Sequence, residues 1–300
     1  MKSTVARDDV FFDSAGDRLA GHLFRPAGAG RHPAVVVTGS WLTVKEQMAD
    51  RYAQRLADQG FVALSFDFAG FGQSGGQPRE VESPVTKSRD IHHAVTFLSR
   101  HEAVDSDRIG ALAICASSGY TAANAVSDAR IRSLALVVPW LHDAGLVEAI
   151  YGGPDGVADR IAAARKARAR YDETGDVDYV PAASRTDPRA AMYGAFDYYL
   201  NADRGAVAAW PNRHAVMAWT EWLTFDPIPL ARRITAPTLI VHSDTAALPD
   251  GARRFHDGLS GPKEIVWLTG DQFDFYDQEP HVTAVVSHAA RHFDATLGHA

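Results

Sequence analysis

Short, continuous apolar runs alternate along most of this chain with segments whose apolar residues recur every three or four positions. The apolar runs are rich in β-branched residues and are bounded by glycine or proline, which is typical of parallel strands buried on both faces. They cover residues 32–40, 61–68, 108–115, 132–140, 236–244 and 263–270. Segments between them, such as 45–60 and 83–101, have helical spacing. The alternation predicts an α/β fold, a mostly parallel central sheet with helices on both faces.

Two regions depart from this rhythm. Near the N-terminus, residues 8–16 and 18–26 read as two strands around a Ser-Ala-Gly-Asp turn, which indicates an antiparallel hairpin. Residues 141–229 contain helical, Ala/Arg-rich and aromatic-rich segments but no clear buried strand. We therefore predict an α/β core formed by residues 1–140 and 230–300, with residues 141–229 inserted as a helical cap.

Composition narrows the class of protein further. The 300 residues are 46% apolar, enough for one large core with an inserted subdomain, and the net charge of −7 argues against a nucleic-acid partner. The single cysteine cannot form an intrachain disulfide, no apolar run reaches the roughly 18 residues of a membrane span, and the first 26 residues lack a signal-peptide core. We expect a cytoplasmic protein that binds a small-molecule substrate away from membranes, with no metal or other cofactor. Formation of a homodimer stays open.

Three local motifs occur in a fixed order within the first half of the chain. They are "VVVTGSWLTVKEQ" at 35–47, "FDFAGFGQSGG" at 66–76 and "RIGALAICASSGY" at 108–120. Their order and spacing resemble the α/β-hydrolase superfamily, closest to its dienelactone-hydrolase-like and peptidase-like branch. In that resemblance the first motif supplies an oxyanion-hole amide, the second a D-x-R-G-x-G-x-S loop with Ala69 at the arginine position, and the third a nucleophile elbow. The resemblance implies an α/β-hydrolase fold with a cap.

The register of the elbow decides which residue is the nucleophile. The family form reads R-[IV]-G, three residues, then small-x-nucleophile-x-small, which places Cys115 at the nucleophile position. A rival register, shifted by two residues, makes Ser117 the nucleophile. With Cys115, the resemblance implies an oxyanion hole formed by the amide of Ala116 and by that of Ser40 or Trp41.

The usual partners of a catalytic triad are replaced in this sequence. The late strand segment "TLIVHSDTAALP" puts Ala246 in the position of the acid, with Asp244 two residues earlier. The last-strand segment "WLTGDQFDFYDQ", anchored on Tyr276, puts Gln272 in the position of the histidine. Glutamine cannot act as a general base near neutral pH, although its amide both donates and accepts hydrogen bonds.

Three hypotheses account for these replacements. First, the base comes from elsewhere, with His142, which follows the sixth core strand, as the best replacement; separately, Asp244 can serve as the acid only if its loop is reshaped. Second, the substrate, a water, or groups such as Asp274 and Tyr276 move the proton while Gln272 orients the substrate or the thiolate. Third, hydrolysis has been lost, leaving a cyclase, isomerase or lyase that reuses the oxyanion hole, or a non-catalytic ligand-binding homologue.

Aromatic residues are concentrated in and beside the predicted cap. This density suits a lid over an apolar or aromatic substrate, although many of the rings could simply fill the core of the cap. The candidates for substrate contact are Trp140, Trp210, Trp219 and Tyr276. We therefore predict a hydrolase that acts on an ester, thioester, lactone or activated carbonyl of a small, largely apolar molecule, with Cys115 as its nucleophile.

Overall fold

The computed structural model describes residues 5–298 and is organised around one eight-stranded sheet. The strands are β1 (Ala6–Ser14), β2 (Asp17–Arg25), β3 (His32–Thr38), β4 (Val62–Phe66), β5 (Val104–Ile114), β6 (Ile131–Val137), β11 (Thr238–Ser243) and β12 (Lys263–Leu268). Their order across the sheet is β1-β2-β4-β3-β5-β6-β11-β12. The predicted core starts at residue 1 and ends at residue 300, but residues 1–4 and 299–300 lie outside the described residues. The first four residues of the segment considered as a signal peptide lie outside them as well.

Six neighbouring strands of this sheet, from β4 to β12, run parallel, whereas β1 and β2 form the antiparallel hairpin at one edge. The continuous apolar runs explain this arrangement, because every residue of β4 and of β11 is buried and both faces of the strands therefore need cover. The carboxyl ends of all six parallel strands consequently meet at one edge, where α/β folds carry their ligand sites.

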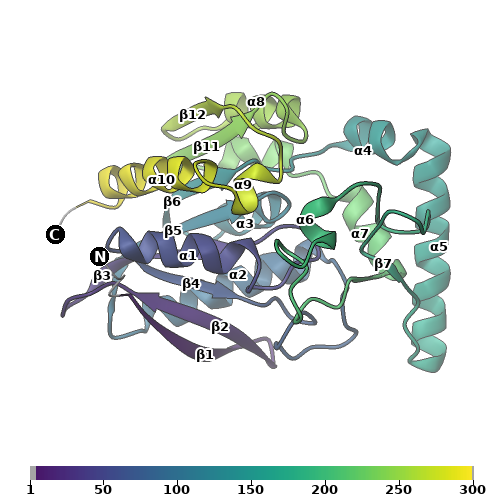
Figure 1. Cartoon of the computed structure of the whole chain (residues 1–300), viewed down its shortest axis with the longest axis horizontal. Helices are drawn as coiled ribbons and strands as arrows, with labels where there is room; N and C mark the ends of the chain where they lie inside the picture. Colours follow the sequence, from purple (N-terminus) through teal and green to yellow (C-terminus); the bar gives the residue numbers. More distant parts are fainter. Residues whose placement is uncertain (1–4, 299–300) are drawn as a thin grey trace.

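Helices cover both faces of the sheet, as Figure 1 shows. Helices α1 (Met48–Asp58) and α10 (His281–Leu297) pack together on one face, and α2 (Pro84–Ser99), α3 (Ser117–Ala125) and α8 (Pro249–Gly258) pack on the other. A side chain at Gly110 of β5 would come within 2.9 Å of the Phe293 ring of α10, so glycine lets this helix lie close against the central strand. The mostly parallel α/β fold predicted from the apolar runs is confirmed.

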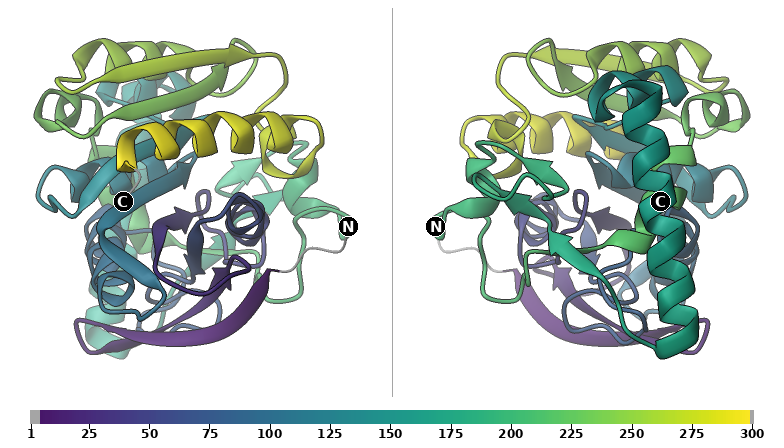
Figure 2. Two further views of the ribbon diagram at one scale, coloured as in Figure 1. Left: turned by 90° about the vertical axis from the view of Figure 1, so that its left-hand side faces the viewer. Right: turned by 90° about the vertical axis from the view of Figure 1, so that its right-hand side faces the viewer.

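The segment between β6 and β11 forms a separate layer beyond the carboxyl ends of the strands (Figures 1 and 2). It contains α4 (Ala144–Tyr151), α5 (Gly153–Thr174), α6 (Asp197–Leu200) and α7 (Trp219–Thr224), with α5 as its long outer helix. It also contains four strands of two or three residues, β7 (Tyr179–Pro181), β8 (Ala183–Ser184), β9 (Met192–Tyr193) and β10 (Arg213–Ala215), which pair β7 with β10 and β8 with β9. Strands this short leave no periodic signal, which is why the sequence indicated helices alone. No helix within residues 5–298 is long and apolar enough to cross a membrane.

Candidate functional site

A cavity of about 730 Å³ lies between the carboxyl ends of the parallel strands and the cap. Its floor comes from loops that follow five different core strands, with Ser40 after β3, Cys115 after β5, Trp140 after β6, Ala246 after β11 and Gln272 after β12. Its cap side is largely apolar and includes Ile150, Tyr151, Met192, Phe196, Tyr199 and Trp222. A cavity of this size accommodates a drug-sized organic molecule.

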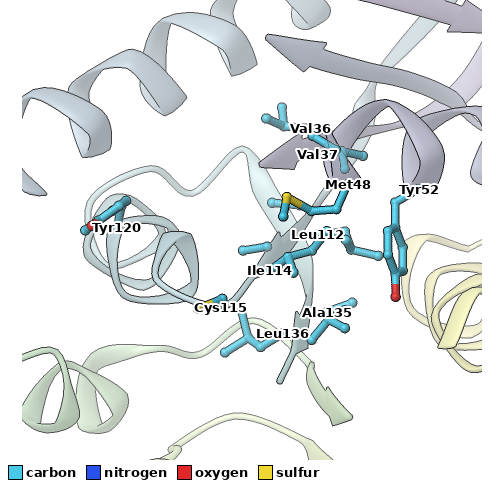
Figure 3. Close-up of a cluster of buried hydrophobic side chains, with 14 of the residues drawn as sticks. Val36, Val37, Met48, Tyr52, Leu112, Ile114, Cys115, Tyr120, Ala135 and Leu136 are labelled. Atoms are coloured by element: carbon cyan, nitrogen blue, oxygen red, sulfur yellow. The ribbon is translucent and has the colours of Figure 1, made fainter. Parts of the chain in front are cut away.

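Cys115 occupies a tight turn between β5 and α3, at the base of this cavity. Its φ of 57° is in the left-handed region, which side chains other than glycine and asparagine rarely adopt. Its N–H donates to the Val137 carbonyl at 3.0 Å, and its carbonyl accepts the Trp140 N–H at 3.0 Å. Figure 3 shows Cys115 directly after Ile114, where the strand ends and the helix begins. The conformation is that of a nucleophile elbow, in which the chain around the turn is fixed by the neighbouring strand.

Ser117, the nucleophile of the rival register, has a structural role in this turn. It is completely buried in the first turn of α3 and does not line the cavity. Its hydroxyl accepts the Thr38 hydroxyl at 2.9 Å and the Ile114 N–H at 3.2 Å. Ser117 therefore joins the ends of β3 and β5 beneath the elbow, and it is not exposed to a substrate.

The Cys115 thiol is buried but surrounded by polar groups. Burial raises the pKa of this thiol above its ordinary value, so the thiol is protonated at neutral pH. Four hydrogen-bonding groups partly offset the effect of burial: the side chains of Ser40, Tyr276 and Gln272, and the backbone of Ala116. The elbow thus presents a neutral thiol that becomes a thiolate only when its proton has a destination.

A chain of hydroxyl groups beside the thiol can relay this proton. The Tyr199 hydroxyl of the cap donates to Ser40 Oγ at 3.0 Å, and Ser40 Oγ lies 3.0 Å from the Tyr276 hydroxyl. Gln272 Nε2 donates to the Tyr276 hydroxyl at 3.2 Å. Burial raises the pKa of both tyrosines well above the ordinary value, so both remain proton carriers rather than phenolates. The thiol, Ser40 and the two tyrosines therefore form one buried network through which a proton can move.

The two replaced triad positions lie side by side. The Ala247 N–H donates to Gln272 Oε1 at 3.0 Å, which places the preceding residue, Ala246, next to Gln272. Gln272 Nε2 also donates to the Val138 carbonyl at 3.0 Å, so both ends of the amide are used. Ala246 is buried and lines the cavity without offering a polar group. The acid and histidine positions read from the sequence are thus adjacent in space, but they hold a methyl group and an amide.

Backbone amides near the thiol are the candidates for an oxyanion hole. The N–H of Ala116 reaches the Cys115 sulfur. Of the two other candidates, the Ser40 N–H lies 3.5 Å from Met48 Sδ, whereas the Trp41 N–H has no partner among the described residues. Of the two candidates for a second oxyanion donor, the Trp41 N–H is therefore the one not already bonded within residues 5–298.

A buried ion pair fixes the loop that carries Trp41. The Leu42 N–H donates to Glu82 Oε2 at 2.9 Å, and Leu42 has a φ of 58°. Lys87 Nζ donates to both Glu82 oxygens at 2.7 Å, and the Tyr120 hydroxyl of α3 donates to Glu82 Oε1 at 2.6 Å. Glu82 therefore links the loop after β3 to the elbow helix, which holds the two amides in a fixed relation.

His142 and Asp244, the replacements suggested by the sequence, lie away from the thiol. His142 Nδ1 accepts the Trp140 indole N–H at 2.8 Å, and burial lowers its pKa to about 4. It does not line the cavity, because the side chain of Trp140 lies on the cavity side of this loop. Asp244 is mostly exposed, pairs with Arg253 and also lies outside the cavity lining. The geometry therefore does not bring either residue to Cys115.

The aromatic candidates divide between the cavity and the core of the cap. Trp140 and Tyr276 line the cavity, as does Trp41. Trp210 donates its indole N–H to the Leu42 carbonyl at 2.7 Å, and Trp219 packs between other aromatic rings. The sequence suggested that both contact the substrate, but neither lines the cavity. Both stabilise the attachment of the cap, because amphipathic rings of this size pack where an indole N–H finds a buried acceptor.

Two cavity residues that matter for the site were not singled out from the sequence. Tyr199 belongs to the aromatic-rich part of the cap, but its hydrogen bond to Ser40 spans 159 positions and has no local signal. Arg160 lies on α5 among other arginines, and nothing in the sequence separates it from the solvent-facing ones. Contacts between the cap and the core depend on how the cap docks, which periodicity does not predict.

Alkylation of Cys115 by iodoacetamide should be slow at neutral pH and accelerate about tenfold per pH unit up to about pH 9. The raised pKa of the thiol is the reason, since the reactive thiolate is a minor species below that pKa and increases with pH. Mass spectrometry of the intact protein measures the rate directly, because the chain has one cysteine. A rate that has already reached its plateau at pH 7 would contradict this prediction.

Comparison with known proteins agrees with this fold. The model of the S15 family of X-Pro dipeptidyl-peptidases matches residues 15–270. A hypothetical protein of Pseudomonas aeruginosa is 31% identical in sequence, and the alignment covers 91% of this chain and 76% of that protein. Its crystal structure superimposes on this chain with a TM-score of 0.86 and 25% identity, covering 98% of this chain and 95% of the other. The crystal structure of the α/β hydrolase GrgF from Penicillium gives a TM-score of 0.83 at 20% identity over 97% of this chain and 99% of its own.

Two relatives that are named for an activity are more distant in sequence. The polyketide transferase claH of Penicillium crustosum is 28% identical, covering 85% of this chain and 86% of its own. A thiohydrolase of Eupenicillium brefeldianum is 25% identical, and the alignment covers 87% of this chain and 85% of that protein. The fold, the elbow and the family match agree, and the resemblance to the α/β-hydrolase superfamily is confirmed. The chain belongs to the S15 family of X-Pro dipeptidyl-peptidases and is an enzyme of the α/β-hydrolase fold.

Proposed function

We propose that this enzyme transfers the acyl group of an activated thioester or ester through a covalent acyl-Cys115 intermediate. The observation that carries the proposal is the position of Cys115, at a left-handed elbow on the floor of an apolar cavity, with the Ala116 amide at its sulfur. We take the Trp41 amide as the second oxyanion donor, since Trp41 lines the same cavity and its N–H has no partner among the described residues. A thiol in that place can attack a carbonyl whose oxygen is held by the two amides. The largely apolar cap side of the cavity suits an apolar or aromatic acyl group.

In the first half of the reaction, Cys115 Sγ forms a bond to the carbonyl carbon, and the carbonyl oxygen gains negative charge. The thiol proton passes through the hydroxyls of Ser40 and Tyr276, whose oxygens are 3.0 Å apart. When the tetrahedral species collapses, the bond to the leaving sulfur or oxygen breaks and that atom takes the proton. The products are the free thiol or alcohol and a thioester on Cys115.

Within residues 5–298 no strong base lies beside the thiol, which favours activated donors. Hydroxyl groups relay protons but accept them poorly, so the leaving group must depart readily, as a thiolate or a phenolate does. Exchange of one thioester for another is also close to balanced in energy, which suits a cysteine nucleophile. Two relatives, a polyketide transferase and a thiohydrolase, have names compatible with this class of substrate.

The second half of the reaction distinguishes acyl transfer from efficient hydrolysis. Water needs a general base to attack a thioester rapidly, and such a base contributes roughly 10²–10⁴-fold. Gln272 holds the position where a histidine would supply it, and its amide is already bonded at both ends. We therefore infer that water releases the acyl group slowly and that a thiol or amine acceptor releases it faster.

Trapping of the acyl-enzyme tests this function. After incubation with S-phenyl 3-phenylpropanethioate, we expect the intact protein to gain the mass of one acyl group, with peptide mapping to Cys115. The adduct should persist for minutes in buffer and disappear on addition of hydroxylamine or a small thiol. Turnover of the thioester without any adduct, even on a millisecond quench, would contradict the covalent step and favour the cyclase or isomerase class. Binding without turnover would favour a ligand-binding protein.

A further inference from the structure

Within residues 5–298, Arg160 is the one cationic side chain that lines the cavity. It lies on α5, which forms the outer part of the cap, and it is partly buried. The other charged lining residue, Asp271, is exposed and follows β12 on the core side. Because Arg160 is only partly buried, its charge does not need a carboxylate partner within the protein and is available to a ligand in the cavity.

Arg160 is held firmly but incompletely satisfied. Its guanidinium stacks over the rings of Tyr151 and Trp219, 5.3 Å and 5.6 Å from their centroids. Its Nη1 donates to the carbonyls of Tyr151 and Gly156 at 2.9 Å and 3.0 Å. Among the described residues no carboxylate pairs with Arg160, and its Nε and Nη2 have no hydrogen-bond acceptor. The edge of the guanidinium that suits a bidentate anion is therefore unused by the protein.

The contacts of Arg160 also place it relative to the elbow. Tyr151 lies within electrostatic range of both the Arg160 guanidinium and the Cys115 thiol. Its hydroxyl accepts the Trp222 indole N–H at 2.8 Å, and the Trp222 ring lies 5.0 Å from that of Trp41. A layer of aromatic side chains thus separates the arginine from the reacting sulfur. A ligand that reaches both groups needs an apolar segment between its reactive carbonyl and its charged end.

We propose that Arg160 recognises a carboxylate or phosphate group of the substrate, so that the enzyme selects amphiphilic acyl donors with an anionic end and an apolar middle. The inference rests on the proposed function only in taking this cavity as the substrate site. The stacked, planar guanidinium is pre-organised for two parallel N–H···O bonds to such a group. The anionic group belongs either to the acyl portion or to the leaving group, and the chemistry that Arg160 offers is the same for both.

Arg160 also has a structural contact, which the test must separate from recognition. Its bonds to Tyr151 and Gly156 join the end of α4 to the beginning of α5, and they use Nη1 alone. Arg160→Lys retains a positive charge without the fork, and Arg160→Gln removes the charge. The matched control is Arg165→Gln, which removes the same charge from an exposed position five residues further along the same helix.

The experiment compares anionic substrates with neutral isosteres. One arm uses S-phenyl thioesters of 3-phenylpropanoic acid that carry a para carboxylate or a para carboxamide. The other arm uses 3-phenylpropanoyl pantetheine with and without its 4′-phosphate. In the arm that matches the true source of the charge, the ratio of kcat/KM for the anionic over the neutral substrate should fall about tenfold in Arg160→Gln and partly in Arg160→Lys. Arg165→Gln should keep the wild-type ratio.

A binding measurement separates this inference from the covalent mechanism. Quenching of cavity tryptophan fluorescence in Cys115→Ala reports the affinity for the para-carboxylated and para-carboxamide acids without turnover. The anion site is supported if Cys115→Ala binds the carboxylate more tightly than the carboxamide and the double variant Cys115→Ala/Arg160→Gln does not. This result supports the site even if no acyl-enzyme forms. The proposal would be overturned if Arg160→Gln left the ratio of kcat/KM for anionic over neutral substrates unchanged in both arms, or if Arg165→Gln lowered that ratio equally. Thermal unfolding must show that the variants compared are folded.

Discussion

Replacing Cys115 by alanine is expected to abolish turnover of an aryl thioester, lowering kcat/KM by a factor on the order of 1,000 or more. The change removes the sulfur that contacts Ser40, Tyr276 and the Ala116 amide, and it leaves the oxyanion amides without a nucleophile beside them. Alanine is small enough for the buried site, so the elbow should stay folded. Steady-state release of thiophenol from the purified variant measures the effect.

The matched control for this experiment is Ser117→Ala. Ser117 is two residues away and carries the only other candidate nucleophile of the elbow, but its hydroxyl bonds to Thr38 and Ile114 instead of facing the cavity. We expect this variant to retain turnover within about tenfold while losing some stability, because a buried hydrogen bond contributes about 1 kcal/mol. The opposite pattern, with an active Cys115→Ala and an inactive Ser117→Ala, would refute the register in which Cys115 is the nucleophile.

The sheet and the elbow could be predicted because both have local signals. Parallel strands inside a sheet are covered on both faces and need continuous apolar runs. Such runs mark β3, β4, β5, β6, β11 and the half-buried edge strand β12. The loops after those strands then had to meet at one edge, which brought Ser40, Cys115 and Gln272 together from distant parts of the sequence. A close turn also restricts the residues around Cys115 to small ones, a pattern that is visible without a structure.

The remainder of the site depends on docking between segments, for which the sequence has no periodic signal. His142 follows β6 closely enough to suggest a base. Trp140 lines the cavity instead, and its indole N–H donates to His142 Nδ1. Whether a cap ring faces the cavity, as Tyr199 does, or packs inside the cap, as Trp219 does, is decided by the tilt of the cap on the core. Arg160 differs from its helical neighbours only through that tilt.

The substitution Gln272→His is expected to turn a slow acyl-enzyme hydrolysis into a faster one, by about tenfold alone and about 100-fold together with Ala246→Asp. An imidazole at this position would lie next to Tyr276 and the thiol, where Gln272 Nε2 now donates. A carboxylate at position 246 would stand beside it, since the neighbouring Ala247 N–H already reaches the Gln272 amide. That carboxylate would orient the ring and stabilise its protonated form during water attack.

The pH dependence identifies the new base. Only the neutral imidazole accepts a proton from water, so the hydrolytic rate of the double variant should rise with pH. The midpoint should lie near the ordinary histidine pKa of about 6.5 or slightly above it, because the new carboxylate favours the charged ring. Single-turnover decay of acyl-Cys115, followed by mass spectrometry from pH 5 to about pH 8, measures it. Gln272→Leu is the control that loses the same amide bonds without gaining a base, and it should not accelerate decay. Equal acceleration in the leucine variant would mean that Gln272 shields the acyl-enzyme by packing, and that the histidine position has been assigned to the wrong residue.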